Sequence, residues 1–259
     1  MITRLQKMFR RVPAQAVPEA SRQRTTREQS DFSAIYAVGD VHGCFNELRA
    51  LEQRIVDDAA TEPGRKLLVM LGDYIDRGPN SRAVLNHLCA PPPADFERVI
   101  LCGNHDDSFL RFLGSPEDNR SWLDFGGQQT LYSYGVDARH VLKSGGVEAL
   151  AEVALDAVPP AHIDLIIGMP IALTVGPLIF VHAGIRPAIA MDEQVDADLM
   201  WIREPFLSEG SRLPAIVIHG HSPSTDAVFS KGRIGIDTGA YATGRLTALK
   251  IANGKAKVL

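Results

Sequence analysis

Hydrophobic and polar residues alternate along the first half of the chain in blocks that predict strands followed by helices. Residues 35–38 form an apolar run of strand length, and the next segment carries Leu48, Leu51 and Ile55 on one helical face. Two more units follow in the same order. Three consecutive strand–helix units predict right-handed crossovers and a largely parallel sheet. The further strands are predicted at 67–71 and 99–102, and the further helices at 79–88 and from 107 onward.

The pattern changes in the second half, where short apolar runs dominate. A helical pattern at 147–158 is followed by apolar runs at 171–175 and 178–181, which flank a Gly-Pro pair and predict a β-hairpin. The two halves together predict an α/β fold, with two mixed β-sheets packed as a sandwich and flanked by helices (α/β/β/α). One domain is predicted to span 33–259. Its last strands are predicted at 215–218, 233–236 and 246–251.

Residues 1–32 are predicted to be a mostly disordered basic tail in front of this domain. They are rich in Arg, Gln, Ser and Thr, and Pro13 and Pro18 would break any long helix. Residues 2–12 could form a short amphipathic turn, which would give weak contact with an anionic membrane surface. No transmembrane segment is expected, since no apolar stretch approaches the ~20 residues that span a bilayer.

The composition is typical of a soluble globular protein. The chain has 259 residues, of which 45% are hydrophobic and 22% charged. Its three cysteines are an odd number without the spacing of zinc ligands, which favours a reducing compartment. The N-terminus also lacks the apolar segment of a secretory signal. These features predict a cytoplasmic location.

The charges are distributed unevenly along the chain. Residues 1–30 hold seven Lys and Arg against two Glu, which leaves 20 basic and 29 acidic residues in 31–259. Non-specific binding of nucleic acid depends on Lys and Arg that neutralise phosphates. A folded part this acidic therefore argues against a nucleic-acid partner.

Polar clusters follow five of the predicted strands. In an open α/β sheet the ligand site lies at the carboxyl ends of the strands. Glycines at these ends allow the backbone to approach a ligand closely. One such cluster would also suit a helix cap with a surface ion pair, but five in order favour a shared site. The clusters are GDVHG at 39–43, GDYIDRG at 72–78, GNHD at 103–106, VHAG at 181–184 and HGHSP at 219–223.

The residue types in these clusters indicate a metal centre. Asp, Asn and neutral His form a mixed nitrogen and oxygen ligand set that suits Mn²⁺, iron or Zn²⁺ better than Ca²⁺. There are more candidate ligands than one ion needs. The excess predicts two ions that share a carboxylate.

The ordered motifs resemble those of the calcineurin-like metallophosphoesterases of the PPP phosphoprotein-phosphatase type, whose signature is GDxHG, GDxxDRG and GNH[ED] followed by two His motifs. The resemblance covers roughly residues 34–250. The sequence is most similar to the compact bacterial serine/threonine protein phosphatases, with the bacterial symmetrical diadenosine tetraphosphatases close behind. The resemblance implies a hydrolase with two divalent ions, manganese first, with iron or zinc as alternatives.

The resemblance also implies the metal ligands, position by position. His221 is preferred over His219, because the family motif reads GH[TS]P and matches residues 220–223. His219 is then a neighbour of the ligands. The implied ligands are Asp40 and His42 for the first metal, Asp73 for both metals, and Asn104, His182 and His221 for the second metal.

The remaining matches are catalytic. His105 matches the family's general acid, and Asp76 matches the carboxylate that orients it. Arg77 matches a phosphate-binding arginine, and Arg203 in the Trp-Ile-Arg segment matches a second phosphate clamp; Asn104 would also contact substrate. The resemblance implies direct attack by a hydroxide that bridges the two metals, without a phosphoenzyme.

The substrate is expected to be a phosphoserine or phosphothreonine protein, with phosphotyrosine left open. Asp76 favours a phosphoprotein substrate for two reasons. Tetraphosphatases often replace this residue. An alkoxide is also a poor leaving group that needs the acid His105, which Asp76 orients. Asp106 stands where protein phosphatases usually have Glu and tetraphosphatases commonly have Asp. Hydrolysis of dinucleoside tetraphosphates or other small phosphoesters therefore stays open. A non-catalytic phosphoprotein-binding protein would lack a ligand or the acid, and none is missing.

Overall fold

The predicted parallel half forms one sheet of five strands in the computed structural model, which describes residues 21–259. Its strands, in spatial order, are β11 (Lys255–Val258), β10 (Ala248–Ala252), β2 (Ala34–Val38), β3 (Lys66–Met70) and β4 (Phe96–Ile100). Strands β2, β3 and β4 are parallel, as predicted. The sheet is mixed because β10 runs antiparallel to both β2 and β11.

The second sheet has six strands and contains the predicted hairpin. Its order is β1 (Arg24–Arg27), β5 (Ala172–Val175), β6 (Leu178–Val181), β7 (Ile216–His219), β9 (Arg233–Gly235) and β8 (Val228–Ser230). Strands β5 and β6 pair antiparallel, whereas β7 is parallel to both β6 and β9. The short edge strand β8 pairs antiparallel with β9 and was not predicted.

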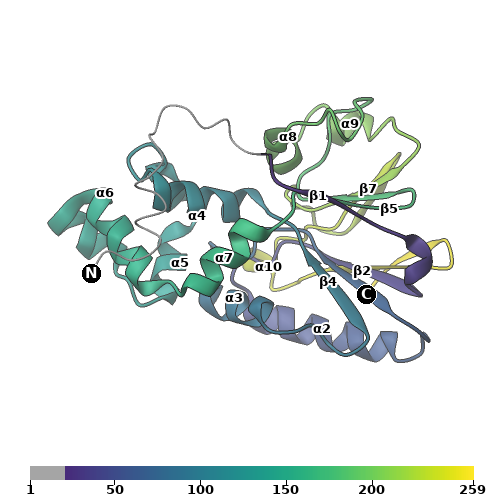
Figure 1. Ribbon diagram of the computed structural model, residues 1–259, viewed down its shortest axis with the longest axis horizontal. Coiled ribbons are helices and arrows are strands. Elements are labelled where there is room, and N and C mark those ends of the chain that lie inside the picture. The colour runs from purple at the N-terminus through teal and green to yellow at the C-terminus, as the bar shows by residue number, and fades with distance from the viewer. Residues whose placement is uncertain (1–20) are drawn as a thin grey trace.

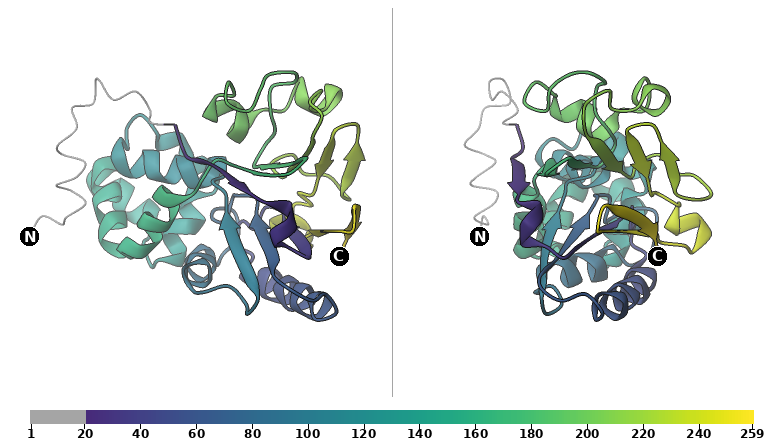
Figure 2. Two further views of the ribbon diagram at one scale, coloured as in Figure 1. Left: turned by 45° about the vertical axis from the view of Figure 1, so that its right-hand side comes forward. Right: turned by 90° about the vertical axis from the view of Figure 1, so that its right-hand side faces the viewer.

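Helices cover the outer faces of the two sheets and one end of the molecule. In Figure 1, α2 and α3 lie below the first sheet, α8 and α9 lie above the second, and α4 to α6 gather at the left. Figure 2 shows the same helical group from two other directions. The helices are α2 (Phe45–Ala59), α3 (Ser81–Cys89), α4 (Asn104–Gly114), η2 (Arg120–Phe125), α5 (Gly127–Ser133), α6 (Ala138–Ala157), α7 (Pro160–Gly168), α8 (Asp196–Trp201), α9 (Phe206–Glu209) and α10 (Ala240–Thr243).

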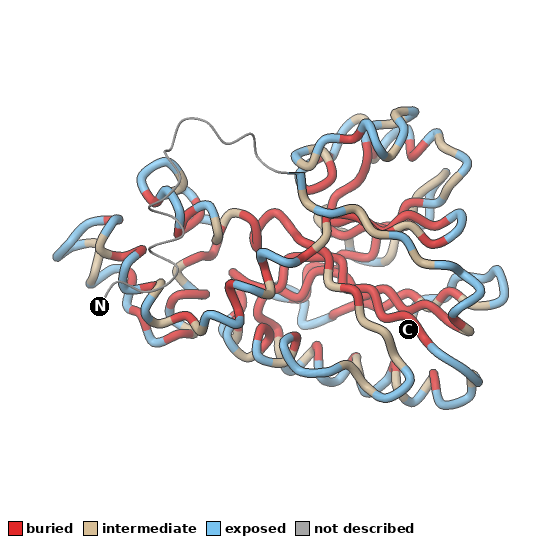
Figure 3. The backbone as a smooth tube through the Cα atoms, in the orientation of Figure 1, coloured by how far each residue is buried: buried red, intermediate tan, exposed pale blue. Residues whose placement is uncertain are grey.

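The two faces of the first sheet belong to different cores. Ile35 and Ala37 of β2 pack with Phe180 of β6 between the sheets, whereas Tyr36 faces the helices and packs in the core that contains Leu51 of α2. Burial on both faces explains why the sequence of β2 is a continuous apolar run. Buried backbone follows these strands in Figure 3. The predicted two-sheet sandwich with flanking helices is confirmed.

Three element boundaries beside the polar clusters differ from the prediction. The third strand was predicted to end at Cys102, but β4 ends at Ile100. The N–H of Cys102 instead donates to the carbonyl of Pro170 at 2.9 Å, outside the strand ladder. The helix expected from residue 107 already begins at Asn104, and the helix expected from residue 79 begins at Ser81.

The predicted tail boundary at residue 32 is wrong for the residues nearest the domain. Arg24–Arg27 pair in parallel with β5 along four residues, and a 3₁₀ turn, η1 (Gln29–Asp31), follows. This polar segment is partly buried by residues that are distant in the sequence. Its local composition could therefore not predict the strand. The amphipathic turn predicted at 2–12 lies outside the described residues. No helix within residues 21–259 is long and apolar enough to cross a membrane.

Arg22 fixes this N-terminal segment to the helices. Its guanidinium donates to Asp107 Oδ1 at 2.8 and 3.2 Å and to the carbonyls of Ile166 and Met169 at 3.0 and 3.3 Å. Both charged side chains are about nine-tenths buried, with 14% and 13% exposed. Removing one partner of such a pair costs much stability, because the other charge stays buried without compensation.

We expect Arg22→Ala to lower the free energy of unfolding by roughly 2 kcal/mol, because hydrogen bonds to a buried carboxylate are lost. Urea denaturation followed by circular dichroism measures the change. The matched control is Arg65→Ala, which removes an ion pair whose arginine is 60% exposed. Equal small effects in both variants would contradict the anchoring role of Arg22.

Candidate active site

The five polar clusters meet where strands of both sheets end. Asp40 and His42 follow β2, Asp73 follows β3, His182 follows β6 and His221 follows β7. Several of these residues have a left-handed backbone, which is uncommon outside glycine and is found at functional sites. The residues concerned are His42, Asp73, Asp76, Arg77 and His221, with φ between 44° and 71°.

Asp73 lies at the centre of the site. Its Oδ2 is 3.4 Å from Nε2 of His42 and 3.4 Å from Nε2 of His182, while its Oδ1 accepts the backbone N–H of His105 at 2.9 Å. Two groups of potential ligands share it: one also contains His42 and His105, the other His182 and His221. The predicted sharing of one carboxylate between two ions matches this geometry.

Backbone carbonyls fix the orientation of two of these histidines. Nδ1 of His42 donates to the carbonyl of Ile75 at 2.8 Å, and Nδ1 of His182 donates to the carbonyl of Leu71 at 2.9 Å. Nε2 of each ring is then directed at the carboxylate of Asp73. Anchoring one ring nitrogen in this way is how proteins prepare the other for a metal. Burial lowers the pKa of His42 to about 3, which keeps it neutral.

Asn104 joins the second group of ligands. Its Oδ1 lies 2.8 Å from Nε2 of His182 and 2.9 Å from Nδ1 of His221. Burial, with the charge of His182 adding to it, lowers the pKa of His221 to about 3. The imidazoles of His182 and His221, an amide oxygen and a carboxylate thus converge in one place, which is the donor set of a borderline divalent ion.

Asp40 lies just outside the two groups. Its carboxylate accepts the backbone N–H of His221 at 3.1 and 3.2 Å. Gly220 leaves room for it, since a Cβ there would lie 2.0 Å from Oδ1 of Asp40. Burial, followed by the charges of Asp237 and Asp73, raises the pKa of Asp40.

Three carboxylates are therefore buried together: Asp40, Asp73 and Asp237 are each at most 4% exposed. Charged groups are tolerated inside a protein only when they are paired or bind metals. The residues present fit two divalent ions, because the cations would supply the missing positive charge. Asp237 was not predicted as a site residue. It follows β9 in an Ile-Asp-Thr-Gly segment. This segment lacks the His that accompanies Asp or Asn in other clusters, so the sequence did not indicate a site residue there.

His105 and Asp76 form a hydrogen-bonded pair beside these ligands. Nδ1 of His105 donates to Oδ2 of Asp76 at 2.7 Å. Burial opposes the charge on His105, yet Asp73 and Asp76 outweigh it and raise the pKa of His105. Trp122 Nε1 and Thr130 Oγ1 also donate to Asp76, at 2.8 and 2.6 Å. These two donors come from η2 and α5 and were missed, because no local pattern connects them to Asp76.

Arg77 contacts His105 of this pair. Its Nη2 donates to Nε2 of His105 at 3.0 Å, and its guanidinium stacks 4.7 Å above the ring of Tyr241. Gly126 permits the close packing of Arg77, since a Cβ there would lie 2.5 Å from the Arg77 amide nitrogen and its φ is 113°. Arg203 lies after α8 and is exposed; Trp201 of that helix places its ring 6.1 Å from the ring of His221.

Both ring nitrogens of His219 have partners other than the candidate ligands. It is buried, its Nδ1 donates to the carbonyl of Gly220 at 3.0 Å, and Arg233 donates to its Nε2 at 3.3 Å. Among the described residues, the group around Asp73 contains His221 and not His219. This agrees with the preference for His221 as the ligand.

Asp106 holds two of the site loops together. Its carboxylate accepts the backbone N–H groups of Asp73, Gly103 and Tyr74 at 2.8, 3.0 and 3.1 Å. Burial, followed by the charge of Asp73, raises the pKa of Asp106 to about 8. In the sequence, Asp106 served to distinguish tetraphosphatases from protein phosphatases. In the structure, its hydrogen bonds position the loop that carries Asp73.

The fold and the site define the class of the protein. Residues 33–250 match the family described as calcineurin-like phosphoesterases, and the chain belongs to that family. It is therefore a phosphoester hydrolase of a family that uses divalent metals.

Several relatives share most of the chain. Bis(5'-nucleosyl)-tetraphosphatase PrpE [asymmetrical] of Anoxybacillus flavithermus is 26% identical over 236 residues, covering 82% of this chain and 88% of its own. The protein of the same name from Geobacillus thermodenitrificans is also 26% identical, with the same coverage. A putative diadenosine tetraphosphatase has a TM-score of 0.61 at 20% identity, covering 92% of this chain and 97% of its own. A cold-active protein-tyrosine phosphatase of a Shewanella psychrophile has a TM-score of 0.55 at 16% identity, covering 92% and 80%, which supports the fold.

We expect Asp73→Asn to reduce bound Mn²⁺ from two ions per chain to at most one, because both groups of ligands lose their shared charge. Elemental analysis after dialysis measures the metal content. The control is Asp118→Asn, which removes an exposed carboxylate from a turn. Two retained ions in Asp73→Asn would contradict a shared carboxylate.

Proposed function

We propose that the protein is a hydrolase with two divalent ions, manganese foremost, in which His105 gives a proton to the leaving group. The observation that carries this proposal is the hydrogen-bonded pair of His105 and Asp76 placed beside the shared carboxylate of Asp73. The proposed ligands are Asp40, His42, Asp73, Asn104, His182 and His221. When bound there, the ions would neutralise phosphate charge and lower the pKa of a water molecule.

The chain's own residues have separate tasks in this proposal. Arg77 would bind the phosphate with its planar guanidinium, which matches the geometry of phosphate oxygens. A phosphate taking up these donors would release Nε2 of His105 from Arg77, so that Nε2 could carry the proton. Asp76 would hold Nδ1 and stabilise the charged ring. Arg203 is proposed as a second phosphate contact, and Asn104 would face the substrate as well as the metal.

Our first candidate substrate is a dinucleoside tetraphosphate. The names of relatives that cover 82% of the chain support it. This reverses the order that the motifs alone favour. Phosphoserine or phosphothreonine in proteins is the second candidate. An alkoxide is a poor leaving group unless it receives a proton, and the His105–Asp76 pair could supply that proton.

The direct experiment compares both substrates in one assay with Mn²⁺. We expect a higher kcat/KM for diadenosine tetraphosphate than for a phosphoserine peptide, and loss of both activities in EDTA. The opposite order of kcat/KM would make the phosphoprotein the substrate. Activity that persists in EDTA would contradict the use of divalent ions.

His105→Gln tests the acid directly. We expect kcat on a phosphoserine peptide to fall by ~10²–10⁴-fold, the usual effect of removing a general acid. The fall on p-nitrophenyl phosphate should be much smaller, because its phenolate leaves with little help. His140→Gln, which changes an exposed histidine on α6, is the matched control. Equal losses on the two substrates would argue against the acid role.

A further inference from the structure

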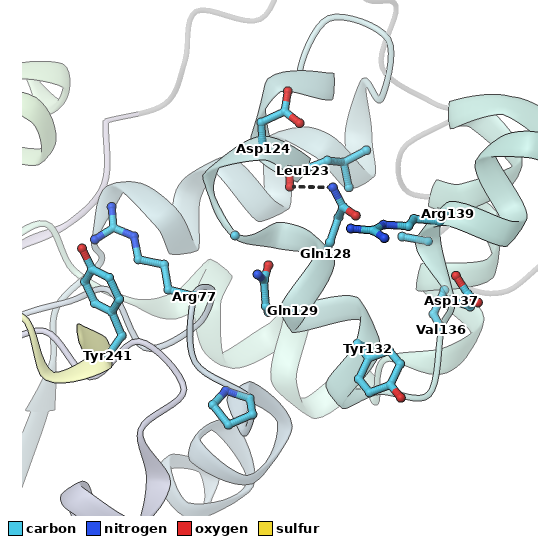
Figure 4. A pocket seen from close by; sticks show the side chains of 13 residues that line it. Arg77, Leu123, Asp124, Gln128, Gln129, Tyr132, Val136, Asp137, Arg139 and Tyr241 are labelled. Atoms are coloured by element: carbon cyan, nitrogen blue, oxygen red, sulfur yellow. Dashed lines mark hydrogen bonds between the residues drawn. The ribbon is translucent and has the colours of Figure 1, made fainter. Parts of the chain in front are cut away.

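An open cleft continues from the active site into the helical part of the molecule. Its volume is about 880 Å³, and it begins at Arg77 and Tyr241, which form the stacked pair described above. Figure 4 shows Gln129 of α5 between this pair and the opposite wall, where Tyr132 and Arg139 lie. The cleft is thus connected to the catalytic centre through Arg77.

Several polar side chains in the cleft have no side-chain partner within the part of the chain that the structure describes. Gln129, Tyr132 and Arg139 form no side-chain hydrogen bond or ion pair there, whereas neighbouring Gln128 donates to the carbonyl of Leu123. Tyr132 is 76% exposed. A tyrosine so exposed contributes little to the core, and its free face can stack on a planar ligand.

The cleft is larger than the scissile phosphate alone would need. Sites for small organic ligands occupy ~300–1,000 Å³, and this cleft falls within that range. Its lining offers an exposed aromatic ring, an amide with both donors and an acceptor, and a second guanidinium. Asp124 adds an acceptor suited to an exocyclic amine. These groups match a base and a phosphate chain better than the alternating apolar side chains of an extended peptide.

We propose that this cleft is a nucleoside subsite, in which Tyr132 stacks on the base and Gln129 bonds its edge. Arg139 would contact a phosphate beyond the scissile one, which Arg77 holds. The proposal rests on the proposed function and assigns the substrate class to this chain's own residues. It makes Tyr132 and Arg139 determinants of specificity rather than of catalysis.

The test compares Tyr132→Ala and Arg139→Ala with two controls. Tyr132→Phe keeps the ring, and Lys143→Ala removes a charge one turn further along α6, outside the cleft. Each protein is assayed with Mn²⁺ on diadenosine tetraphosphate, a phosphoserine peptide and p-nitrophenyl phosphate. Thermal unfolding checks that the exposed substitutions leave the fold intact.

We expect Tyr132→Ala to lower the ratio of kcat/KM for diadenosine tetraphosphate to that for p-nitrophenyl phosphate about tenfold, the effect of losing one stacked base. Arg139→Ala should lower the same ratio severalfold, and both controls should keep it. An unchanged ratio in Tyr132→Ala would overturn the subsite. So would a selective loss on the phosphopeptide, which would assign the cleft to a peptide.

ATP binding to the metal-free protein, measured by calorimetry in EDTA, separates this proposal from the catalytic one. If the wild type hydrolyses p-nitrophenyl phosphate but Tyr132→Ala binds ATP as tightly as the wild type, the subsite is wrong and the hydrolase stands. If no phosphoester is hydrolysed, the proposed function fails, and tenfold weaker ATP binding in Tyr132→Ala would still support the subsite.

Discussion

Burial of the Asp73 carboxylate is the constraint on which the rest of the site depends. Burial opposes its charge, yet the surrounding imidazoles of His182, His105 and His42 hold the pKa of Asp73 below its ordinary range. Asp40 and Asp237 add two more acidic groups nearby. Divalent ions, which the family uses, would supply positive charge to this buried set of acidic groups.

The fold meets this constraint by bringing the ends of strands from both sheets to one place. Asp106 accepts three backbone N–H groups and so fixes the loops after β3 and β4 relative to each other. Carbonyls of Leu71 and Ile75 orient two of the histidines. The left-handed backbone at several site residues is a local strain of the kind that packing elsewhere must offset. These contacts hold the candidate ligands around Asp73.

Much of the fold and of the candidate site could be predicted from the sequence, because both depend on short-range patterns. Apolar runs with two buried faces gave the strands, and the Gly-Asp and Gly-Asn-His clusters after them gave Asp73 and Asn104 as candidates. What the sequence missed depends on long-range contacts. Strand β1 exists through its pairing with β5, and Trp122 reaches Asp76 from a separate helical turn. The cleft likewise arises only where η2, α5 and α6 meet.

The central claim is that Asp73 binds both ions, and anomalous diffraction from crystals of the Mn²⁺-loaded protein tests it most directly. The account predicts two anomalous peaks ~3.5–4 Å apart, the separation usual in two-metal sites, with the carboxylate of Asp73 bonded to both. A single peak, or two peaks of which Asp73 contacts only one, would contradict the account.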